Sequence, residues 1–318
     1  MMAKPALLMT GQMMPLIMEG CEAAFEVHRY WQAADRAAFL RQVGPSIRGI
    51  CTGTFTGVKT DDALMAACPN LKIVSNFGVG YDSVDAAAAA RRGVVVTNTP
   101  DVLTEEVADT ALGLLLNTVR EFSRAEKWLR DGRWAKDGDY RLTPASLRDR
   151  SVGIAGLGRI GKAIARRLEA FGVPVSYFGR SQQLGVSYRH YSDLVALARD
   201  VDTLIVVTPG GSDTQNLINA QVLAALGPRG ILINISRGSV VDEAALIEAL
   251  KARTILAAGL DVFRSEPNLN PAFLELDNAT LFPHVGSASQ HTRNAMGQLV
   301  VDNLVAFAEG TPPRTPVA

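Results

Sequence analysis

Three side chains that can donate, accept or stabilise a proton lie shortly after three successive apolar segments in the second half of this 318-residue chain: Arg237, Glu266 and His284. Because ligands bind at the carboxyl ends of strands in an open α/β sheet, we expect these side chains to face one site. A carboxylate that reaches an imidazole orients the ring and stabilises its protonated form. A guanidinium holds a carboxylate by two parallel hydrogen bonds and polarises a neighbouring carbonyl. The three residues therefore predict protonation of a carbonyl oxygen in a substrate that carries a carboxylate.

The chain has four histidines, and the other three are weaker candidates than His284. We expect His28 to lie in an amphipathic helix, His190 in a polar loop, and His291 at the start of a helix. A single histidine in such a setting is more often structural or exposed than catalytic. The glutamate and arginine at neighbouring strand ends distinguish His284 from the others.

Residues 151–165 have the pattern of a buried strand, a glycine turn and the start of a helix. Gly156, Gly158 and Gly161 form the G-x-G-x-x-G pattern of dinucleotide-binding turns. The first glycine permits the tight turn, the second lets the backbone approach a pyrophosphate, and the third lets helix and strand pack closely. The pyrophosphate then binds N–H groups at the helix N-terminus. Such turns also occur for packing alone, but the surrounding strands favour a dinucleotide.

The end of the next expected strand indicates which dinucleotide binds. NAD-binding domains carry an acidic residue about 20 residues after the glycine turn, where it binds the ribose 2′-hydroxyl. Here the strand runs into Gly179, Arg180 and Ser181 instead. The glycine leaves room and the arginine supplies positive charge, and both suit a 2′-phosphate. The sequence therefore predicts NADP(H).

A second glycine-rich loop, residues 76–82, follows an expected strand in the first third of the chain. Its glycines, Gly78 and Gly80, can direct backbone N–H groups outward, and such groups bind carboxylates. An ordinary glycine turn is the alternative. Taken alone, the loop favours the ordinary turn.

The composition is that of an ordinary globular protein: 47% of the residues are hydrophobic, 20% are charged, and 32 basic residues balance 32 acidic ones. This zero balance gives no indication of a nucleic-acid or anionic-membrane surface. No apolar run has the length of a membrane-spanning helix. Cys21, Cys51 and Cys68 have neither metal-site nor disulfide spacing, and no metal ion is expected. We expect a cytoplasmic protein without nucleic-acid or membrane partners.

Alternating strand-like and helix-like segments predict an α/β fold of two Rossmann-like domains, each a parallel sheet flanked by helices, with a cleft and hinge between them. Because the glycine turn lies near the middle, we expect a discontinuous substrate domain, 1–99 with 289–318, and a dinucleotide-binding domain, 100–288. An irregular excursion over 128–141 is expected to pack on a partner subunit. The expected strands are 6–9, 47–51, 73–76, 94–97, 151–155, 174–178, 203–207, 230–235, 255–261 and 279–282, and the main helices are 15–27, 35–43, 61–68, 84–91, 103–121 and 289–309.

Together these motifs resemble the D-isomer-specific 2-hydroxyacid dehydrogenases over essentially the whole chain. Within that family the sequence is most similar to the NADPH-preferring glyoxylate/hydroxypyruvate reductases and the hydroxyphenylpyruvate reductases. Formate-oxidising members carry Gln where this chain has Glu266, and NAD-using members carry Asp where it has Gly179. The segments that carry the resemblance are 77–82, 102–113, 156–161, 234–238, 259–267 and 283–287.

The resemblance implies a role for each motif residue. Arg237 binds the substrate carboxylate and carbonyl, His284 is the acid–base residue, and Glu266 orients it. Val79 and Gly80 form the substrate loop. The residues that line the cofactor are Thr110, Gly156, Leu157, Gly158, Arg159, Ile160, Gly161, Gly179, Arg180, Ser181, Thr208, Pro209, Ile235, Ser236, Gly286 and Asp261, the last of which receives the nicotinamide carboxamide.

We therefore expect a homodimeric enzyme that uses NADPH to reduce a small 2-oxo acid, glyoxylate or hydroxypyruvate, to the D-2-hydroxy acid. Hydroxyphenylpyruvate or another 2-oxo acid is the alternative within the fold; a phosphorylated substrate would need cationic residues that loop 76–82 lacks. A cofactor-sensing binding protein is the alternative from a different class. The side chain of the substrate is expected to lie near Phe55, Trp134 and His291.

Overall fold

The computed structural model describes residues 4–148 and 150–317, which belong to two compact units. The first unit comprises Met1–Leu103 and Ser289–Ala318, and the second comprises Thr104–Ala288. Residues 100–103, expected in the second unit, belong to the first. The division falls later because helix α5 begins at Thr104. The cleft and hinge between the domains stay predictions.

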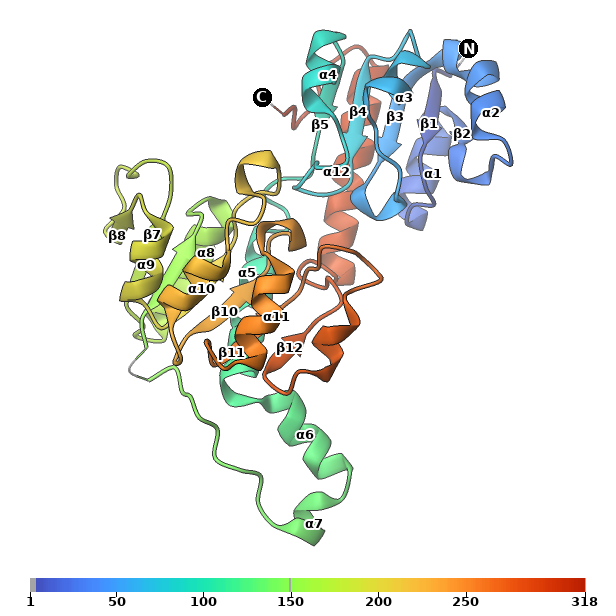
Figure 1. Cartoon of the computed structure of the whole chain (residues 1–318). Helices are drawn as coiled ribbons and strands as arrows, with labels where there is room; N and C mark the ends of the chain where they lie inside the picture. The colour runs from blue at the N-terminus through green and yellow to red at the C-terminus, as the bar shows by residue number, and fades with distance from the viewer. Residues whose placement is uncertain (1–3, 149, 318) are drawn as a thin grey trace. The chain divides into compact units, whose positions relative to one another are not determined.

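In the described residues of the first unit, a five-stranded sheet has the order β2-β1-β3-β4-β5, and all neighbouring pairs are parallel (Figure 1). Helices α1 and α12 pack closely on each other, since a Cβ on Gly20 would lie 2.8 Å from the Val301 side chain. The strands are β1 (Ala6–Met9), β2 (Glu26–Arg29), β3 (Ile47–Thr52), β4 (Ile73–Asn76) and β5 (Val95–Thr97). The helices are α1 (Pro15–Ala24), α2 (Arg36–Val43), α3 (Asp62–Ala66), α4 (Ala86–Arg91) and α12 (Gln290–Ala308).

In the described residues of the second unit, a seven-stranded parallel sheet has the order β12-β11-β10-β9-β6-β7-β8. The strand order reverses between β6 and β9, the position at which doubly wound sheets bind ligands. The strands are β6 (Val152–Ala155), β7 (Val175–Phe178), β8 (Arg189–Tyr191), β9 (Thr203–Val206), β10 (Ile231–Asn234), β11 (Ala257–Leu260) and β12 (Ala279–Leu281). The helices are α5 (Thr104–Arg120), α6 (Phe122–Arg130), α7 (Arg133–Asp137), α8 (Arg159–Ala170), α9 (Leu194–Asp200), α10 (Ala220–Leu226) and α11 (Glu243–Lys251). The predicted α/β class, with a parallel sheet flanked by helices in each unit, is confirmed.

Short polar side chains fix where many of these helices begin. Each accepts backbone N–H groups two or three residues later, which have no partner inside the helix. These N-caps are Asp35, Asp61 and Asp85 in the first half of the chain, and Asp193, Asn219, Asp242 and Ser289 in the second.

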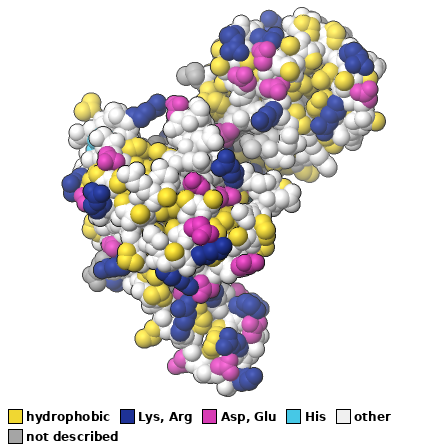
Figure 2. Space-filling view, viewed as in Figure 1, with side chains coloured by type: hydrophobic (Ala, Val, Ile, Leu, Met, Phe, Trp, Pro, Cys, Tyr) yellow, Lys and Arg dark blue, Asp and Glu magenta, His cyan; other side chains and the backbone are white. Residues whose placement is uncertain are grey.

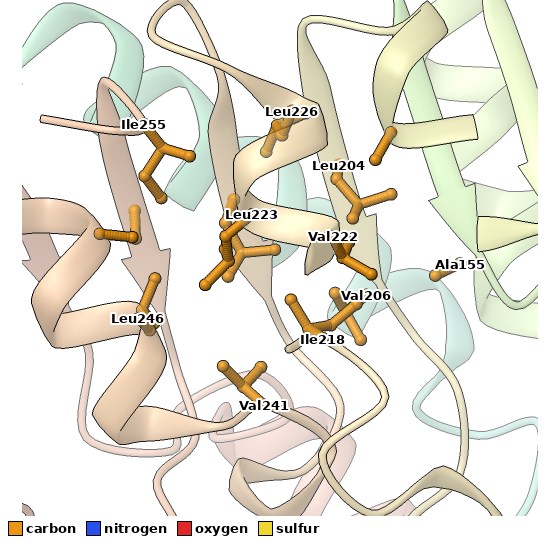
Figure 3. Close-up of a cluster of buried hydrophobic side chains, with 14 of the residues drawn as sticks. Ala155, Leu204, Val206, Ile218, Val222, Leu223, Leu226, Val241, Leu246 and Ile255 are labelled. Carbon is orange, nitrogen blue, oxygen red and sulfur yellow. The ribbon is translucent and has the colours of Figure 1, made fainter. Parts of the chain in front are cut away.

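The core of the second sheet is built by the apolar runs that the sequence analysis identified as strands. Figure 3 shows Leu204 and Val206 of β9 facing Val222, Leu223 and other side chains of α10 and α11. The residues of β6, β9 and β10 are all buried, which explains why these strands appear as continuous apolar runs in the sequence.

Two predictions about histidines were wrong. His28 lies in β2 and not in a helix, because α1 ends at Ala24 and buried Phe25 adopts an extended conformation. His190 lies in β8 and not in a loop. The three residues of β8 contain no apolar run, and the strand is defined by its pairing with β7.

The predicted irregular excursion over 128–141 was also wrong in part, because α6 and α7 are helical. Charged pairs four residues apart support both helices: Lys127 with Asp131, Arg130 with Glu126, and Arg133 with Asp137. Figure 1 shows the two helices extending away from the sheet of their own unit, and Figure 2 shows charged side chains gathered on them. In α6 these charged pairs accompany apolar residues at helical spacing, Phe122, Ala125 and Leu129.

Within residues 4–148 and 150–317, no helix combines the length and the apolar character needed to cross a membrane. The same residues contain no group of side chains arranged to hold a metal ion. Cys21, Cys51 and Cys68 are buried free thiols.

Candidate active site

His284 and Glu266 form a hydrogen-bonded pair in the second unit. Nδ1 of His284 lies 2.7 Å from Oε2 of Glu266, whose other oxygen accepts the N–H of Phe263 at 2.8 Å. Burial raises the pKa of Glu266, but these two hydrogen bonds and the charge of Arg237 lower it more, so that this pKa lies below its usual value. Because an ionised Glu266 can only accept, the ring carries a proton on Nδ1 and presents Nε2 to a ligand. The imidazole side chain is 41% exposed, so a ligand can reach it.

The backbone at His284 is strained and braced by Asp261. His284 has a φ of +54°, in the left-handed region that costs a non-glycine residue about 1–2 kcal/mol. The two carboxylate oxygens of Asp261 accept the N–H groups of Val285 and Gly286 at 2.7 and 2.8 Å. Burial raises the pKa of Asp261, and these hydrogen bonds oppose that rise. Thr110 adds a hydrogen bond to the carbonyl of Gly286 at 3.2 Å. The role of Asp261 toward a nicotinamide carboxamide stays a prediction.

Arg237 is held by the buried side chain at the end of β10. Asn234 is 1% exposed, and its amide nitrogen donates to the carbonyl of Arg237 at 3.0 Å. Its oxygen accepts both the N–H and the hydroxyl of Ser236 at 3.1 and 3.0 Å. A Cβ on Gly238 would lie 1.9 Å from the backbone of Phe263, so this turn packs directly on the segment that leads to the glutamate. The turns that carry the arginine, glutamate and histidine therefore lie next to one another.

The glycine turn after β6 has room for a ligand. Gly156 has a φ of +99°, and a Cβ on Gly161 would lie 2.3 Å from the carbonyl oxygen of Gly156, so the fold itself requires both glycines. A Cβ on Gly158 would meet nothing within 4 Å, and α8 begins after Gly158 without a side-chain cap. Among the described residues, the buried hydroxyl of Thr208 has no partner. Open space, helix N–H groups and an unpartnered hydroxyl fit the phosphates of a dinucleotide.

The residues after β7 have no acidic side chain and an exposed cation. Gly179 does not have a positive φ, and a Cβ there would lie 3.7 Å from its nearest neighbour, an ordinary contact. The fold therefore does not require glycine at this position. The side chains of Arg180 and Ser181 are exposed. Space and positive charge at the end of the strand fit a 2′-phosphate.

The glycine-rich loop after β4, in the first unit, is held by side-chain amides. Asn76 donates to the carbonyls of Gly78 and Gly80 at 3.2 and 3.1 Å, and Asn98 donates to that of Val79 at 2.9 Å. Thr99 exchanges two hydrogen bonds with Gly78, at 3.0 and 3.1 Å. Within the described residues, the N–H groups of Val79 and Gly80 have no acceptor. The loop therefore offers two adjacent N–H groups, which is the geometry of an anion site.

The remaining predicted residues include two aromatic side chains expected near the substrate, Phe55 and Trp134. Phe55 packs edge-on against Phe77 beside the glycine-rich loop, with ring centres 5.9 Å apart, and is 58% exposed. Trp134 belongs to α7 instead, where its indole N–H donates to Asp139 at 3.1 Å. The positions expected to line the cofactor follow the ends of β6, β9 and β10: Leu157, Arg159, Ile160, Pro209 and Ile235.

Sequence reasoning missed the supporting amides Asn76, Asn98 and Asn234. Asn76 and Asn234 are the last residues of β4 and β10, and Asn98 directly follows β5. An amide side chain where a buried apolar strand ends was the signal that could have identified them.

The two outer glycines and the middle glycine of the turn should respond differently to an added methyl group. We expect Gly161→Ala to lower the free energy of unfolding by about 1–3 kcal/mol, because its Cβ meets backbone that cannot move aside. Gly158→Ala is the matched control and should change it by less than about 0.5 kcal/mol. Urea unfolding followed by circular dichroism measures both. Equal destabilisation by the two substitutions would contradict the interpretation that Gly158 faces open space in which a ligand can bind.

Comparison with known proteins places the chain among enzymes. A family model described as D-isomer specific 2-hydroxyacid dehydrogenase, NAD binding domain, matches residues 112–286. The chain is 44% identical over 310 residues to a hydroxyphenylpyruvate reductase of Plectranthus scutellarioides, covering 98% of each chain. It is 43% identical over 296 residues to a glyoxylate/hydroxypyruvate reductase of Arabidopsis thaliana, covering 93% of each.

A solved structure from Sinorhizobium meliloti is similar over nearly the whole chain. That protein is an NADPH-dependent glyoxylate/hydroxypyruvate reductase in complex with NADP and malonate. It shares 53% sequence identity and a TM-score of 0.95, covering 99% of this chain and 97% of the other. Sequence motifs, fold and these relatives agree, and the chain belongs to the D-isomer-specific 2-hydroxyacid dehydrogenase family.

Proposed function

We propose that the protein is an NADPH-dependent reductase that converts small 2-oxo acids, glyoxylate and hydroxypyruvate foremost, to D-2-hydroxy acids. The observation that carries the proposal is the 2.7 Å hydrogen bond between Glu266 and His284. This bond lies in a unit whose glycine turn has the space and N–H groups for a dinucleotide. The NADP-bound reductase of Sinorhizobium meliloti, 53% identical, supports both the reaction and the cofactor.

His284 is the proton donor in this proposal. NADPH, when bound, supplies the hydride that reduces the substrate carbonyl carbon. Glu266 holds the imidazole through Nδ1, so Nε2 carries the proton that passes to the carbonyl oxygen. The carboxylate also stabilises the protonated ring before transfer. Asp261 keeps the backbone of the histidine in its strained conformation. This fixes the position of the Cα atom from which the imidazole side chain extends.

Arg237 in the second unit and the substrate loop in the first unit are each suited to a carboxylate in this proposal. The guanidinium of Arg237 suits a carboxylate because it offers two parallel N–H donors, and its charge polarises an adjacent carbonyl. Val79 and Gly80 contribute backbone N–H groups whose direction is set by Asn76 and Asn98. Both elements select for a 2-oxo acid over an uncharged ketone.

An arylpyruvate is the second candidate substrate. The exposed ring of Phe55, supported edge-on by Phe77, offers an aromatic surface beside the substrate loop. The hydroxyphenylpyruvate reductase of Plectranthus scutellarioides, 44% identical, supports this alternative. The family's other class, a cofactor-sensing binding protein, requires cofactor binding without turnover.

The first experiment compares initial rates of nicotinamide absorbance loss for glyoxylate, hydroxypyruvate and 4-hydroxyphenylpyruvate, each with NADPH and with NADH. We expect NADPH to be preferred and the two small acids to be the better substrates.

His284→Asn should lower kcat/KM by about 10²–10⁴-fold without weakening NADPH binding, because only proton transfer is lost. His28→Asn, in β2, is the matched control. Near-normal turnover by His284→Asn would refute the mechanism, and cofactor binding with no turnover of any acid would favour a sensor.

The substrate loop gives a separate prediction. Asn98→Ala removes the donor to the carbonyl of Val79, so the loop N–H groups lose their fixed direction. We expect KM for the 2-oxo acid to rise by about fivefold to tenfold while the affinity for NADPH is unchanged. Asn70→Ala, which removes an exposed amide bonded to Pro45 in the same unit, is the matched control. An unchanged KM, or an equal loss of NADPH affinity, would contradict this role.

We also propose that two copies of the chain associate through residues 122–142. Four large apolar side chains on this segment are at least half exposed: Phe122 (51%), Leu129 (53%), Trp134 (59%) and Leu142 (95%). Exposed apolar side chains on one such extension favour a second copy as their cover.

A cytoplasmic location is proposed as well, because Cys21 and Cys51 are buried in contact as free thiols, which a reducing compartment maintains.

Light scattering coupled to gel filtration tests the dimer. We expect the wild-type protein at twice the 34.0 kDa chain mass, and the double variant Leu129→Asp, Trp134→Asp at the mass of one chain. Leu274→Asp, at another exposed apolar side chain, is the control and should remain dimeric. A wild-type monomer, or a dimer that survives the double substitution, would exclude this interface.

A further inference from the structure

Two aromatic side chains, Tyr177 and His190, hold the loop between β7 and β8. Tyr177 of β7 is 1% exposed, and its hydroxyl oxygen accepts the N–H of Gln183 at 2.8 Å. His190 of β8 packs on the Tyr177 ring with ring centres 5.1 Å apart, and its Nε2 lies 2.9 Å from the carbonyl oxygen of Gly179. These contacts hold the two ends of segment 179–183, which contains Arg180 and Ser181.

The side chain of Gln183 also reaches the glycine turn after β6. Its Nε2 donates to the carbonyl oxygen of Leu157 at 2.7 Å. Leu157 lies between Gly156 and Gly158, so a single amide joins the turn that fits the pyrophosphate to the segment that fits the 2′-phosphate. Gln182, one residue earlier, is exposed, whereas Gln183 is half-buried.

We propose that Gln183, held by Tyr177, is a positioning residue that sets the preference for NADPH over NADH. The 2′-phosphate and the pyrophosphate belong to one adenosine, so the protein must hold their two binding segments at a matching separation. A loop that is already fixed does not lose conformational entropy when it closes on the ligand, and affinity improves accordingly. The inference rests on the proposed use of NADPH, and in it Gln183 acts by fixing the geometry of the loop.

The binding of two adenosine fragments isolates this effect from catalysis. Adenosine 2′,5′-bisphosphate carries both phosphates, and 5′-AMP lacks the 2′-phosphate. Isothermal titration of each fragment into the whole protein measures what the 2′-phosphate contributes. Gln183→Met keeps the side-chain volume and removes the amide that donates to Leu157. Gln182→Met is the matched control at the neighbouring exposed position.

We expect Gln183→Met to weaken binding of the bisphosphate by about threefold to tenfold and to leave 5′-AMP binding within about twofold of wild type. KM for NADPH should rise by a similar factor while kcat and the KM for NADH stay unchanged. Tyr177→Phe removes the acceptor for the Gln183 N–H and should act in the same direction. Gln182→Met should bind both fragments as the wild type does.

Two results would overturn the inference while leaving NADPH as the cofactor. Wild-type bisphosphate affinity in both Gln183→Met and Tyr177→Phe would show that the bridge has no role. Equal weakening of both fragments would show that Gln183 supports only the glycine turn. A wild-type protein that binds the bisphosphate no better than 5′-AMP would instead overturn the proposed cofactor, and the inference with it.

Discussion

The candidate functional loops in this protein leave the carboxyl ends of parallel strands, and there the backbone loses its hydrogen-bond partners in the sheet. Buried backbone groups without partners destabilise a fold, so a side chain must replace the missing strand. Asn76, Asn234 and Asp261 do this, and each is no more than 1% exposed. Asn76 and Asn234 each bond to at least two groups of the turn that follows their own strand, whereas Asp261 bonds to two N–H groups of the turn after the neighbouring strand β12. The same bonds decide which groups of the turn remain available to a ligand.

The kind of side chain at the strand end determines what the turn can bind. Asn76 uses its amide nitrogen on carbonyls and so leaves N–H groups of the substrate loop unpaired. Asp261 does the opposite, because a carboxylate only accepts, and it ties down the N–H groups after His284. Asp261 therefore maintains the strained backbone of the histidine, and Glu266 separately orients its ring. Position and orientation of the imidazole are controlled by two different carboxylates.

Apolar runs and strand-end residues could be predicted from the sequence, whereas pairing partners could not. Strands such as β9 and β10 are buried along their whole length. Arg237, Glu266 and His284 were identified as candidates from their positions after expected strands. Strand β8 has the sequence Arg-His-Tyr, which carries no apolar signal, and its structure depends on β7. The α6–α7 extension is stabilised by charge pairs that apolar periodicity does not detect. Asn76 and Asn98 resemble ordinary turn residues until the carbonyls that they hold are known.

The glycine turn shows how far a motif alone can be interpreted. From the sequence, the three glycines fit either a ligand or close packing, and the structure separates these explanations residue by residue. Gly156 and Gly161 are required by packing, since a Cβ on either would lie 3.0 Å or less from backbone. Of the three glycines, only Gly158 faces open space. The fold would accept a side chain there, so packing does not explain this glycine. Two thirds of the motif thus encode the strand–turn–helix fold, and the remaining glycine, together with the unpartnered hydroxyl of Thr208, carries the argument for a bound phosphate.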